Sequence, residues 1–533
     1  MKRTNVLWIT GLVLGWFFDF LFWKSGQGIN FAIYVALCLA GGFLVLSLNN
    51  LKPSWKSPVL LIPILFFASM SFIRLEPLTQ FLSFALTLGL MSLLAVTFLG
   101  GRWPWYSLSD YVANIVRLVG SMIARPFMFR SARQKEAAAA GPVEAGVAAS
   151  RFGWKRFWAI FRGLLIALPI VILFATLLSS ADLVFAQRIQ DFTKLFRLEK
   201  FPEYIFRLTY ILISAYALMG VFLHAAQKSQ DEKLVGMEKP LVSPFLGFTE
   251  AAVILGAVVL LFAVFVGIQF RYFFGGQTNI GIQGYTFSEY ARQGFGELVT
   301  VAFFSLLLFL GLSAIVNRQT PTQRWTFSGL GIGMVVLVGV ILDSAFQRLL
   351  LYEAAYGFSR LRMYTHIFMV WLGVLLAAVV VLDILRKERL FAMAALLASI
   401  GFAATLAIAN VDGTIVRQNV SRAASGGALD VAYITSLSPD SVPALADSLL
   451  DGRLTPAVRN GIGAVLVCRR NADQTDTDWR AFSLSRWSAN RSLQQTQVRE
   501  ILDNYRILDN EWPVQVQTPL GEKYDCSSLG GMD

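Results

Sequence analysis

Ionisable side chains gather in two stretches that follow long apolar segments. One stretch, 285–297, reads YTFSEYARQGFGE, and the other, 342–362, reads LDSAFQRLLLYEAAYGFSRLR. With the residues directly after 410, they supply nine candidate polar side chains: Glu289, Arg292, Glu297, Arg348, Glu353, Arg360, Arg362, Asp412 and Asn419. Because a planar guanidinium binds carboxylate or phosphate through paired hydrogen bonds, these residues form either a structural network of paired charges or a site for an anionic or lipid-linked group.

These residues could serve as a catalytic base and as phosphate ligands, but no fixed spacing between them supports a catalytic site. A lipid-linked glycosyl or phosphoryl transferase would use Glu289 or Glu353 as the base and Arg292 and Arg360 on the diphosphate. Signatures of soluble enzymes are missing, since the chain has no P-loop and no Cys-x-x-Cys pair. Its two histidines have no neighbour at metal-ligand spacing, so we expect no metal and no cofactor.

Asp19 and Arg207 form a second candidate pair of charges within apolar sequence. Each lies near the end of a long hydrophobic segment, where an ionisable group is costly unless it has a partner. Both segment ends fall on the same side of the membrane in the topology below. We therefore expect Asp19 to be buried and Arg207 to be its partner.

The elements that must position these residues are membrane-spanning helices. The 533 residues are 56% hydrophobic and 15% charged, with a mean hydropathy of +0.58. A helical span needs about 20 apolar residues, and backbone groups in lipid must be satisfied within their own segment, so the fold class is all-α. We predict a polytopic bundle of eleven spans at 5–23, 29–48, 57–74, 78–99, 157–179, 205–226, 247–270, 296–316, 326–346, 363–385 and 390–410.

The distribution of Lys and Arg predicts the orientation of this bundle. The basic segment 101–156 belongs inside by the positive-inside rule, which places the N-terminus in the cytoplasm. Residues 1–100 then hold the first four spans and 157–410 the other seven, with outer polar loops at 271–295 and 344–362. The net charge of +12 reflects loop orientation, and we expect no nucleic-acid partner.

Segment 101–156 divides into an amphipathic stretch and a linker. Residues 105–125 have apolar side chains at helical spacing and arginines at Arg117 and Arg125, which predicts a helix along the inner leaflet that stops before Pro126. Residues 131–150 are rich in Ala and Gly and predict a flexible linker. The helix is either an ordinary interfacial helix or a sensor of anionic lipid.

The tail, 411–533, predicts a small extracytoplasmic helical domain. Amphipathic helices are expected at 439–451, 455–470 and roughly 477–509, separated by Pro, Gly and Asp-rich breaks. Cys468 and Cys526 both fall in this exported region, where a disulfide can form, whereas Cys38 falls inside a span.

Four segments of the chain resemble a known family. They are SEYARQGFGEL (288–298), LYEAAYGFSRLRMY (351–364), FFDFLFW (17–23) with Gly26 and Gly28, and LDVAYITSLSPDSVPAL (429–445). They are similar to the bacterial membrane family called domain of unknown function 4173, which is related to family 4153. The resemblance implies a multipass protein of the bacterial cytoplasmic (inner) membrane and no established activity.

Three classes of function remain from the sequence. A non-enzymatic sensor or scaffold would present its outer polar cluster and outer domain to a membrane or envelope protein partner. An enzyme would act on a polyprenyl-phosphate-type substrate at the outer leaflet. A transporter ranks last, because no inverted repeat is evident and the charges lie at the rim of the bundle, away from the middle of the membrane.

Overall fold

The structure is a computed structural model that describes residues 3–139, 201–230, 244–273, 295–472, 478–508 and 513–526, with Leu234 and isolated positions between 163 and 188. Helix dominates these residues, so the chain has the all-α polytopic fold expected from its composition. Ten of the described helices are long and apolar enough to cross a membrane. The predicted span 157–179 lies almost entirely outside the described residues.

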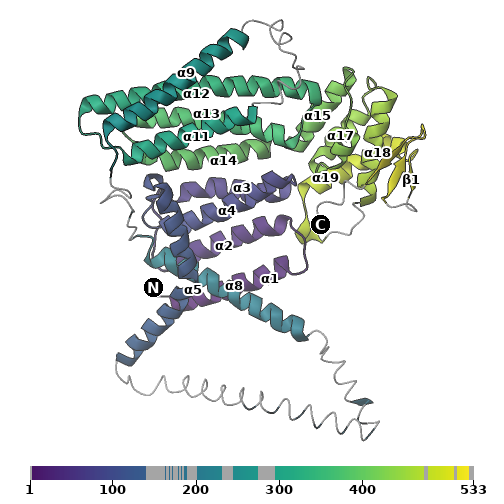
Figure 1. The fold of residues 1–533 in the computed structure, drawn as a ribbon. Coiled ribbons are helices and arrows are strands. Elements are labelled where there is room, and N and C mark those ends of the chain that lie inside the picture. The colour runs from purple at the N-terminus through teal and green to yellow at the C-terminus, as the bar shows by residue number, and fades with distance from the viewer. Residues whose placement is uncertain are drawn as a thin grey trace.

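The membrane helices form two stacked groups (Figure 1). The N-terminal helix group contains α1 (Thr4–Phe22), α2 (Ile29–Leu48), η1 (Pro58–Leu60), α3 (Leu61–Ile73), α4 (Pro77–Thr97) and α8 (Phe201–Gln227). The C-terminal helix group contains α9 (Phe248–Phe273), α11 (Phe295–Ile315), α12 (Pro321–Tyr356), α13 (Arg360–Ile384), η6 (Glu388–Leu390) and α14 (Phe391–Ala409). Ala403 of α14 joins the two groups, because it is buried in the core formed by α3 and α4.

The bundle has two ends, which we call the domain face and the far face. The domain face carries the turns at 23–28, 74–76 and 357–359 and the break at 410, and the C-terminal domain lies against it (Figure 1). The far face carries the turns at 49–57, 98–102, 316–320 and 385–387. The predicted polar residues that the structure describes thus belong mainly to the domain face.

Local sequence signals explain where several helices begin. The Glu76 carboxylate accepts hydrogen bonds from the amides of Leu78 and Thr79, and Pro77 occupies the first position of α4. Thr320 and Gln323 cap each other in a capping box at the start of α12. Asn410, at φ +47, ends α14 and caps α15, so the predicted boundary at 410/411 coincides with a sharp break in the helix.

Helix α12 overturns the expected outer loop at 344–362. It continues without interruption to Tyr356, over 36 residues, so it is about 54 Å long and extends beyond a hydrocarbon layer of ~30 Å. The polar residues of the sequence stretch are therefore held on a rigid helix as far as Glu353. Leu349 and Ala345 on this last part are fully buried, and their packing keeps the helix intact.

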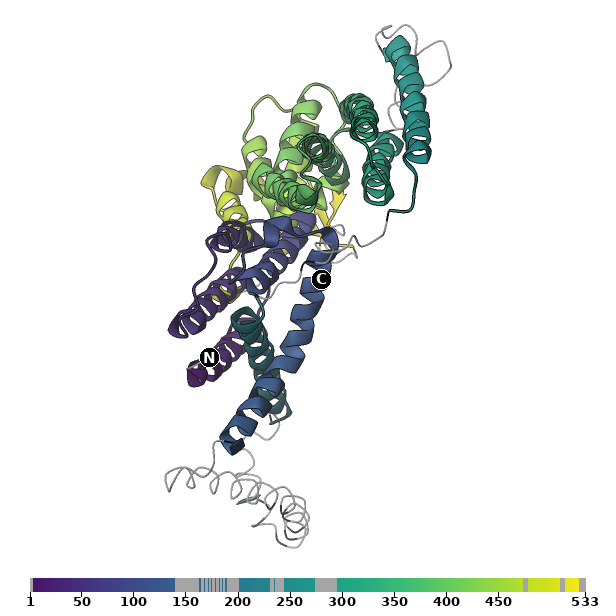
Figure 2. The same ribbon diagram turned by 90° about the vertical axis from the view of Figure 1, so that its left-hand side faces the viewer.

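Helix α5 (Leu108–Ala139) lies across the far ends of the N-terminal helix group and follows η2 (Trp103–Trp105) (Figures 1 and 2). Although its length and composition would allow it to span a membrane, this crosswise position fits the expected interfacial helix. The predicted stop before Pro126 is wrong, because Pro126 lies inside the helix. Contact with α8 supports the helix at this point, since the Tyr216 hydroxyl donates to the Ile123 carbonyl, one turn before Pro126, at 2.7 Å.

The C-terminal domain is helical with one small sheet. Its helices are α15 (Val411–Ala424), α16 (Val431–Thr435), η7 (Pro439–Ser441), α17 (Val442–Leu449), α18 (Pro456–Ala472), η8 (Trp479–Ala481), α19 (Leu484–Leu493) and α20 (Thr496–Leu502). The strands β1 (Arg506–Leu508), β2 (Gln515–Gln517) and β3 (Lys523–Asp525) form an antiparallel sheet that pairs Ile507 with Val516 and Val516 with Tyr524.

The predicted helix at 477–509 is wrong as a single element, since the chain forms η8, α19, α20 and β1 there. Extended residues at Phe482, Ser483 and Gln495 break the helix. Cys468 of α18 and Cys526 after β3 are joined by a disulfide with Cα atoms 5.5 Å apart, and Cys38 is a buried free thiol. The disulfide ties the sheet to the main helix of the domain.

Candidate functional site

An ion pair between Arg360 and Asp412 lies at the centre of the domain face. Arg360 begins α13, and its guanidinium donates to both Asp412 oxygens at 2.8 and 2.6 Å. The Asp412 side chain is 0% exposed and also accepts from the Ser438 amide at 2.7 Å. Because a buried carboxylate is costly unless all its lone pairs are used, these contacts fix the start of α15 and the Ser438 turn onto α13.

Asp440 joins the same turn of the domain to α4. Its carboxylate accepts from the amides of Leu75 and Glu76 at 2.8 and 3.0 Å, and it lies 3.8 Å from the Arg74 guanidinium. Burial raises the pKa of Asp440 above its usual range, and the hydrogen bond from Leu75 opposes that shift. Glu76 accepts a further hydrogen bond from the hydroxyl of Tyr364, which belongs to α13. The α3–α4 turn is thereby tied to the domain and to the C-terminal helix group.

Asn419 closes the third contact of the domain face. Its amide accepts from the Phe358 N–H at 2.7 Å and donates to the Phe358 carbonyl at 2.9 Å. The neighbouring Gly357 has φ +82, and a Cβ there would lie 2.6 Å from the Asn419 side-chain oxygen. Arg362 also donates to the Gly357 carbonyl and lies over the Tyr352 ring at 4.2 Å. The α12–α13 turn is therefore fixed against α15.

The α1–α2 turn is fixed against η8 by backbone contact. The Ile29 amide donates to the Phe482 carbonyl at 2.9 Å, and Arg480 donates to the carbonyl of Phe20. A Cβ at Gly28 would lie 2.4 Å from the backbone of Ala481, so only glycine fits there. The domain thus contacts turns of both helix groups.

Together these contacts make a domain-face network, which we define as Glu76, Arg360, Asp412, Asn419 and Asp440. The hydrophobic core of the domain continues into the bundle beneath it, because Leu445 and Val465 belong to a cluster that packs on Leu78, Met363 and Phe402. The domain is accordingly anchored by buried polar bonds and by a shared apolar core. The buried, paired side chains of the domain-face network are suited to mechanical coupling between the domain and the bundle, and less to exchange of a ligand.

Glu353 and His366 form a separate buried pair between α12 and α13. Glu353 is 1% exposed, and its carboxylate lies 3.3 Å from the His366 Nδ1 atom. The ring of Phe346 packs against the imidazole in a tilted arrangement, with ring centroids 4.5 Å apart. An acid and an imidazole at this distance are the side chains that proton transfer requires, although their burial keeps solvent away.

The remaining predicted residues have different surroundings. Arg348 is half-buried on α12 and Glu297 is exposed at the start of α11, whereas Glu289 and Arg292 lie outside the described residues. Asp19 is buried and accepts from Arg207 Nε and Nη2 at 3.0 and 2.5 Å. The structure therefore brings together Arg360 with Asp412, Asn419 with the Gly357 turn and Asp19 with Arg207.

The sequence analysis does not single out Glu76, Asp440 or the pairing of His366 with Glu353. Glu76 precedes Pro77 in a pattern typical of a helix start, and Asp440 follows Pro439 in a turn motif, so their local sequence indicates only helix-start and turn positions. Their contacts join residues more than 280 positions apart, as with Tyr364 and Glu76. No spacing rule in one sequence reveals such contacts.

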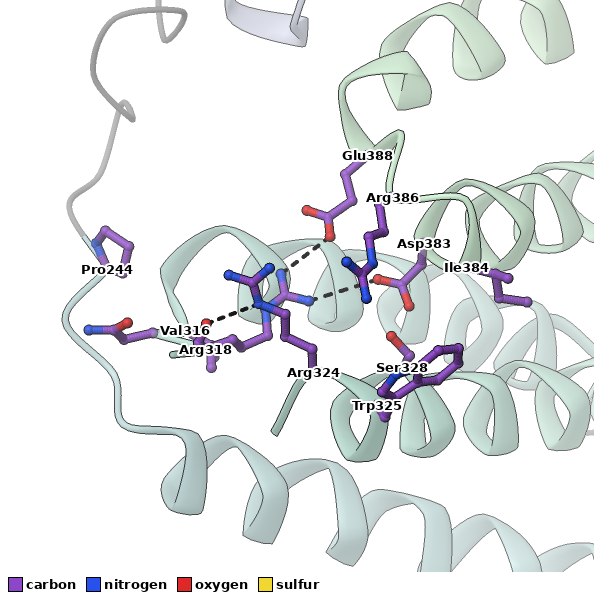
Figure 3. A pocket seen from close by; sticks show the side chains of 11 residues that line it. Pro244, Val316, Arg318, Arg324, Trp325, Ser328, Asp383, Ile384, Arg386 and Glu388 are labelled. Atoms are coloured by element: carbon purple, nitrogen blue, oxygen red, sulfur yellow. Dashed lines mark hydrogen bonds and ion pairs between the residues drawn. The ribbon is translucent and has the colours of Figure 1, made fainter. Parts of the chain in front are cut away.

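On the far face, a cavity of about 410 Å³ lies between the start of α12 and the α13–α14 turn (Figure 3). Arg318, Arg324 and Arg386 point toward it, together with Asp383 and Glu388. Arg318 lies 3.8 Å from Asp383 and 3.6 Å from Glu388, and it donates to the Ser313 carbonyl. This cavity is polar, but its carboxylates already neutralise most of its positive charge.

The comparisons with known proteins agree with this architecture. Residues 61–448 match the family described as Domain of unknown function (DUF4153). This is the family 4153 that the sequence analysis names as a relative of family 4173. No curated protein and no solved structure shows significant similarity to the chain. The match covers most of the bundle and the start of the C-terminal domain, including all five residues of the domain-face network. The chain is therefore a multipass membrane protein that belongs to the DUF4153 family.

Proposed function

We propose that this protein is a non-enzymatic membrane scaffold or sensor that presents its C-terminal domain on a rigid base. The observation that carries the proposal is the use of the domain-face charges. Arg360 of α13 bonds to Asp412 of α15, and Asp440 accepts from the Leu75 amide before α4, so the domain is attached to turns of both helix groups. A force or ligand acting on the domain would consequently act on both groups at once.

The proposal includes a location and a partner. We infer that the domain face is extracytoplasmic and the far face cytoplasmic, in the cytoplasmic membrane of a bacterium, because the basic segment 101–139 begins at the far face. The partner is a membrane or envelope protein that contacts the exposed side of the domain. The segments quoted above also support a relation to family 4173.

An enzyme acting on a lipid-linked substrate is the second candidate, and the Glu353–His366 pair is the observation that favours it. Substitution of Glu353 by Gln keeps the shape and removes the charge. An enzyme that uses this carboxylate would lose its activity, whereas a scaffold would keep its function.

Complementation of a deletion strain by paired glycine variants tests the proposal. Gly28→Ala places a Cβ 2.4 Å from the Ala481 backbone and should undock the domain, whereas a Cβ at Gly26 meets only the Ala481 Cβ at 3.4 Å. Gly26→Ala is therefore the matched control. Protease sensitivity of the domain in spheroplasts, whose cytoplasmic membrane is accessible from outside, reports undocking in both variants.

The scaffold predicts that Gly28→Ala exposes the domain to protease and loses function, while Gly26→Ala and Glu353→Gln retain both docking and function. Loss of function in Glu353→Gln with the domain still docked would overturn the scaffold in favour of the enzyme. Cleavage in spheroplasts at the far face in place of the domain would overturn the orientation.

A further inference from the structure

A basic pocket of about 750 Å³ opens on the far face between α4, α5 and α8. Its cations come from three places in the chain: Arg102 follows α4, Arg117 and Arg125 belong to α5, and Lys228 follows α8. No carboxylate occurs among its described lining residues. We call this cavity the far-face basic pocket.

The positive charge of this pocket has no compensating acid within the described part of the chain. Arg117 donates to the Asn114 side-chain oxygen at 3.1 Å. Arg125 donates to the Ser121 hydroxyl at 3.2 Å and to the Gln227 side-chain oxygen at 3.1 Å. Both guanidiniums are thus positioned by neutral acceptors, which orient them without removing their charge.

The base of the pocket is polar and ordered. The buried Ser121 hydroxyl lies 2.7 Å from the Nδ1 atom of His224, which is itself buried in α8. Met122 beside them packs its backbone onto Gly220, where a Cβ would lie 2.5 Å from the Met122 Cα. The close approach of α5 to α8 therefore holds the arginines in place.

The same helices line an apolar groove of about 200 Å³ next to this base, which α2 also borders. Leu118 and Met122 of α5 face the groove, and Asn114, Ser121 and Arg125 on the adjoining side of the same helix face the basic pocket. The groove is also lined by Leu39, Phe43, Leu88, Met91, Leu218 and Phe222. A charged pocket beside an apolar groove matches the two parts of a phospholipid.

Helix α5 also exposes a continuous apolar stripe. Its members, Leu108, Val112, Ile115, Val119, Ile123 and Phe127, recur every three or four residues and are all exposed. A helix with such a stripe and basic side chains beside it lies at the boundary between headgroups and acyl chains. The stripe places the basic pocket at the depth of the lipid phosphates.

We propose that the far-face basic pocket binds the phosphate group of an anionic phospholipid, whose acyl chain occupies the neighbouring groove. The arginines and Lys228 supply the charge-assisted hydrogen bonds, and clusters of this kind between membrane helices are suited to anionic headgroups. A soluble phosphate compound would use the same cations but not the groove. The protein thereby senses the anionic lipid content of the far leaflet.

Ligand titrations of the purified full chain in detergent test this assignment. The probes are short-chain phosphatidylglycerol, short-chain phosphatidylcholine and inorganic phosphate. We expect phosphatidylglycerol to bind and the other two to bind at least about tenfold more weakly. Arg102→Gln with Lys228→Gln should lower the affinity for phosphatidylglycerol at least about tenfold, since the double variant removes two charge-assisted hydrogen bonds to the phosphate.

Two control variants separate the possible outcomes. Arg130→Gln removes an exposed charge from α5 outside the pocket lining and should change the affinity less than about twofold. Ser92→Phe fills the groove and should weaken binding of phosphatidylglycerol without changing that of phosphate. Equal affinity for phosphate and lipid, with no effect of Ser92→Phe, would overturn the lipid in favour of a soluble anion. Absence of binding, or an equal loss in Arg130→Gln, would overturn the pocket.

Discussion

The two faces of the bundle use charged residues in opposite ways. At the domain face, the guanidinium of Arg360 meets the buried carboxylate of Asp412, which has three hydrogen bonds. In the far-face basic pocket, neutral acceptors position Arg117 and Arg125, and no carboxylate lies beside the four cations among the described lining residues. Paired buried charges fix the relative positions of helices, whereas unpaired cations repel one another and are kept together at a cost to stability. The same residue types therefore serve attachment on one face and ligand binding on the other.

The largest expected effect follows removal of Asp412. Asp412→Ala leaves the partly buried Arg360 without its carboxylate, which should lower the free energy of unfolding by about 3–5 kcal/mol. Thermal unfolding in detergent measures the loss. The double variant Arg360→Met with Asp412→Leu should recover much of the stability, and simple additivity of the two single variants would contradict the pairing.

Removal of the disulfide should have the next largest effect, because the disulfide stabilises the C-terminal domain, which is attached to the domain face. The bridge between Cys468 and Cys526 closes a loop with a sequence separation of 58. Cys468→Ser should cost the domain up to ~4 kcal/mol in the chain-entropy view. Labelling of unreduced, denatured protein should find one thiol, that of Cys38, and three reactive thiols would disprove the bridge.

A smaller effect is expected in the pH dependence of the free energy of unfolding, and it arises from Asp440 at the domain face. The pKa of Asp440 is raised from 3.8 by burial, so the folded domain retains a proton that the unfolded chain has lost. The contribution of Asp440 to stability should then decrease as the pH rises from 3.8 through the raised pKa. Asp440→Asn can still accept from the Leu75 amide and should remove this slope. An unchanged pH profile of unfolding would exclude Asp440 as its source.

The smallest effect is expected at the far face. Arg102→Gln with Lys228→Gln removes two exposed cations from an uncompensated group and should change the unfolding free energy by at most about 0.5 kcal/mol, toward higher stability. Salt should reduce the difference between variant and wild type, because screening weakens the repulsion. A large destabilisation would show that these cations are paired after all and would remove the contrast between the faces.

Much of the fold follows from sequence, because membrane insertion constrains each helix separately. The length and apolar character of α1, α2, α4 and α11 mark them without reference to their neighbours. The errors occur where packing overrides a local signal. Pro126 should end a helix, but α5 is held against α8 by Tyr216 and Gly220. The spans predicted from hydropathy place 344–362 in an outer polar loop, yet buried Leu349 and Ala345 keep α12 helical as far as Tyr356.

The candidate site was only partly accessible to sequence analysis. An ionisable residue in an apolar segment needs a partner, and this rule was sufficient to propose Asp19 with Arg207. It could not select Asp412 as the partner of Arg360 from several nearby carboxylates. The anchoring by Asp440 depends on backbone amides, which every residue except proline carries, so no side-chain pattern indicates it.

The contact between η8 and the α1–α2 turn has a consequence for how the protein is made. Arg480 bonds to the carbonyl of Phe20 across 460 positions of sequence. At a synthesis rate of about 5–20 residues per second, roughly 20–90 seconds separate the appearance of these two residues. During that interval the turn around Gly28 is already in the membrane but its partner does not yet exist. The two helix groups must therefore be inserted and held together by their own packing before the C-terminal domain, which is synthesised last, can bind to both of them.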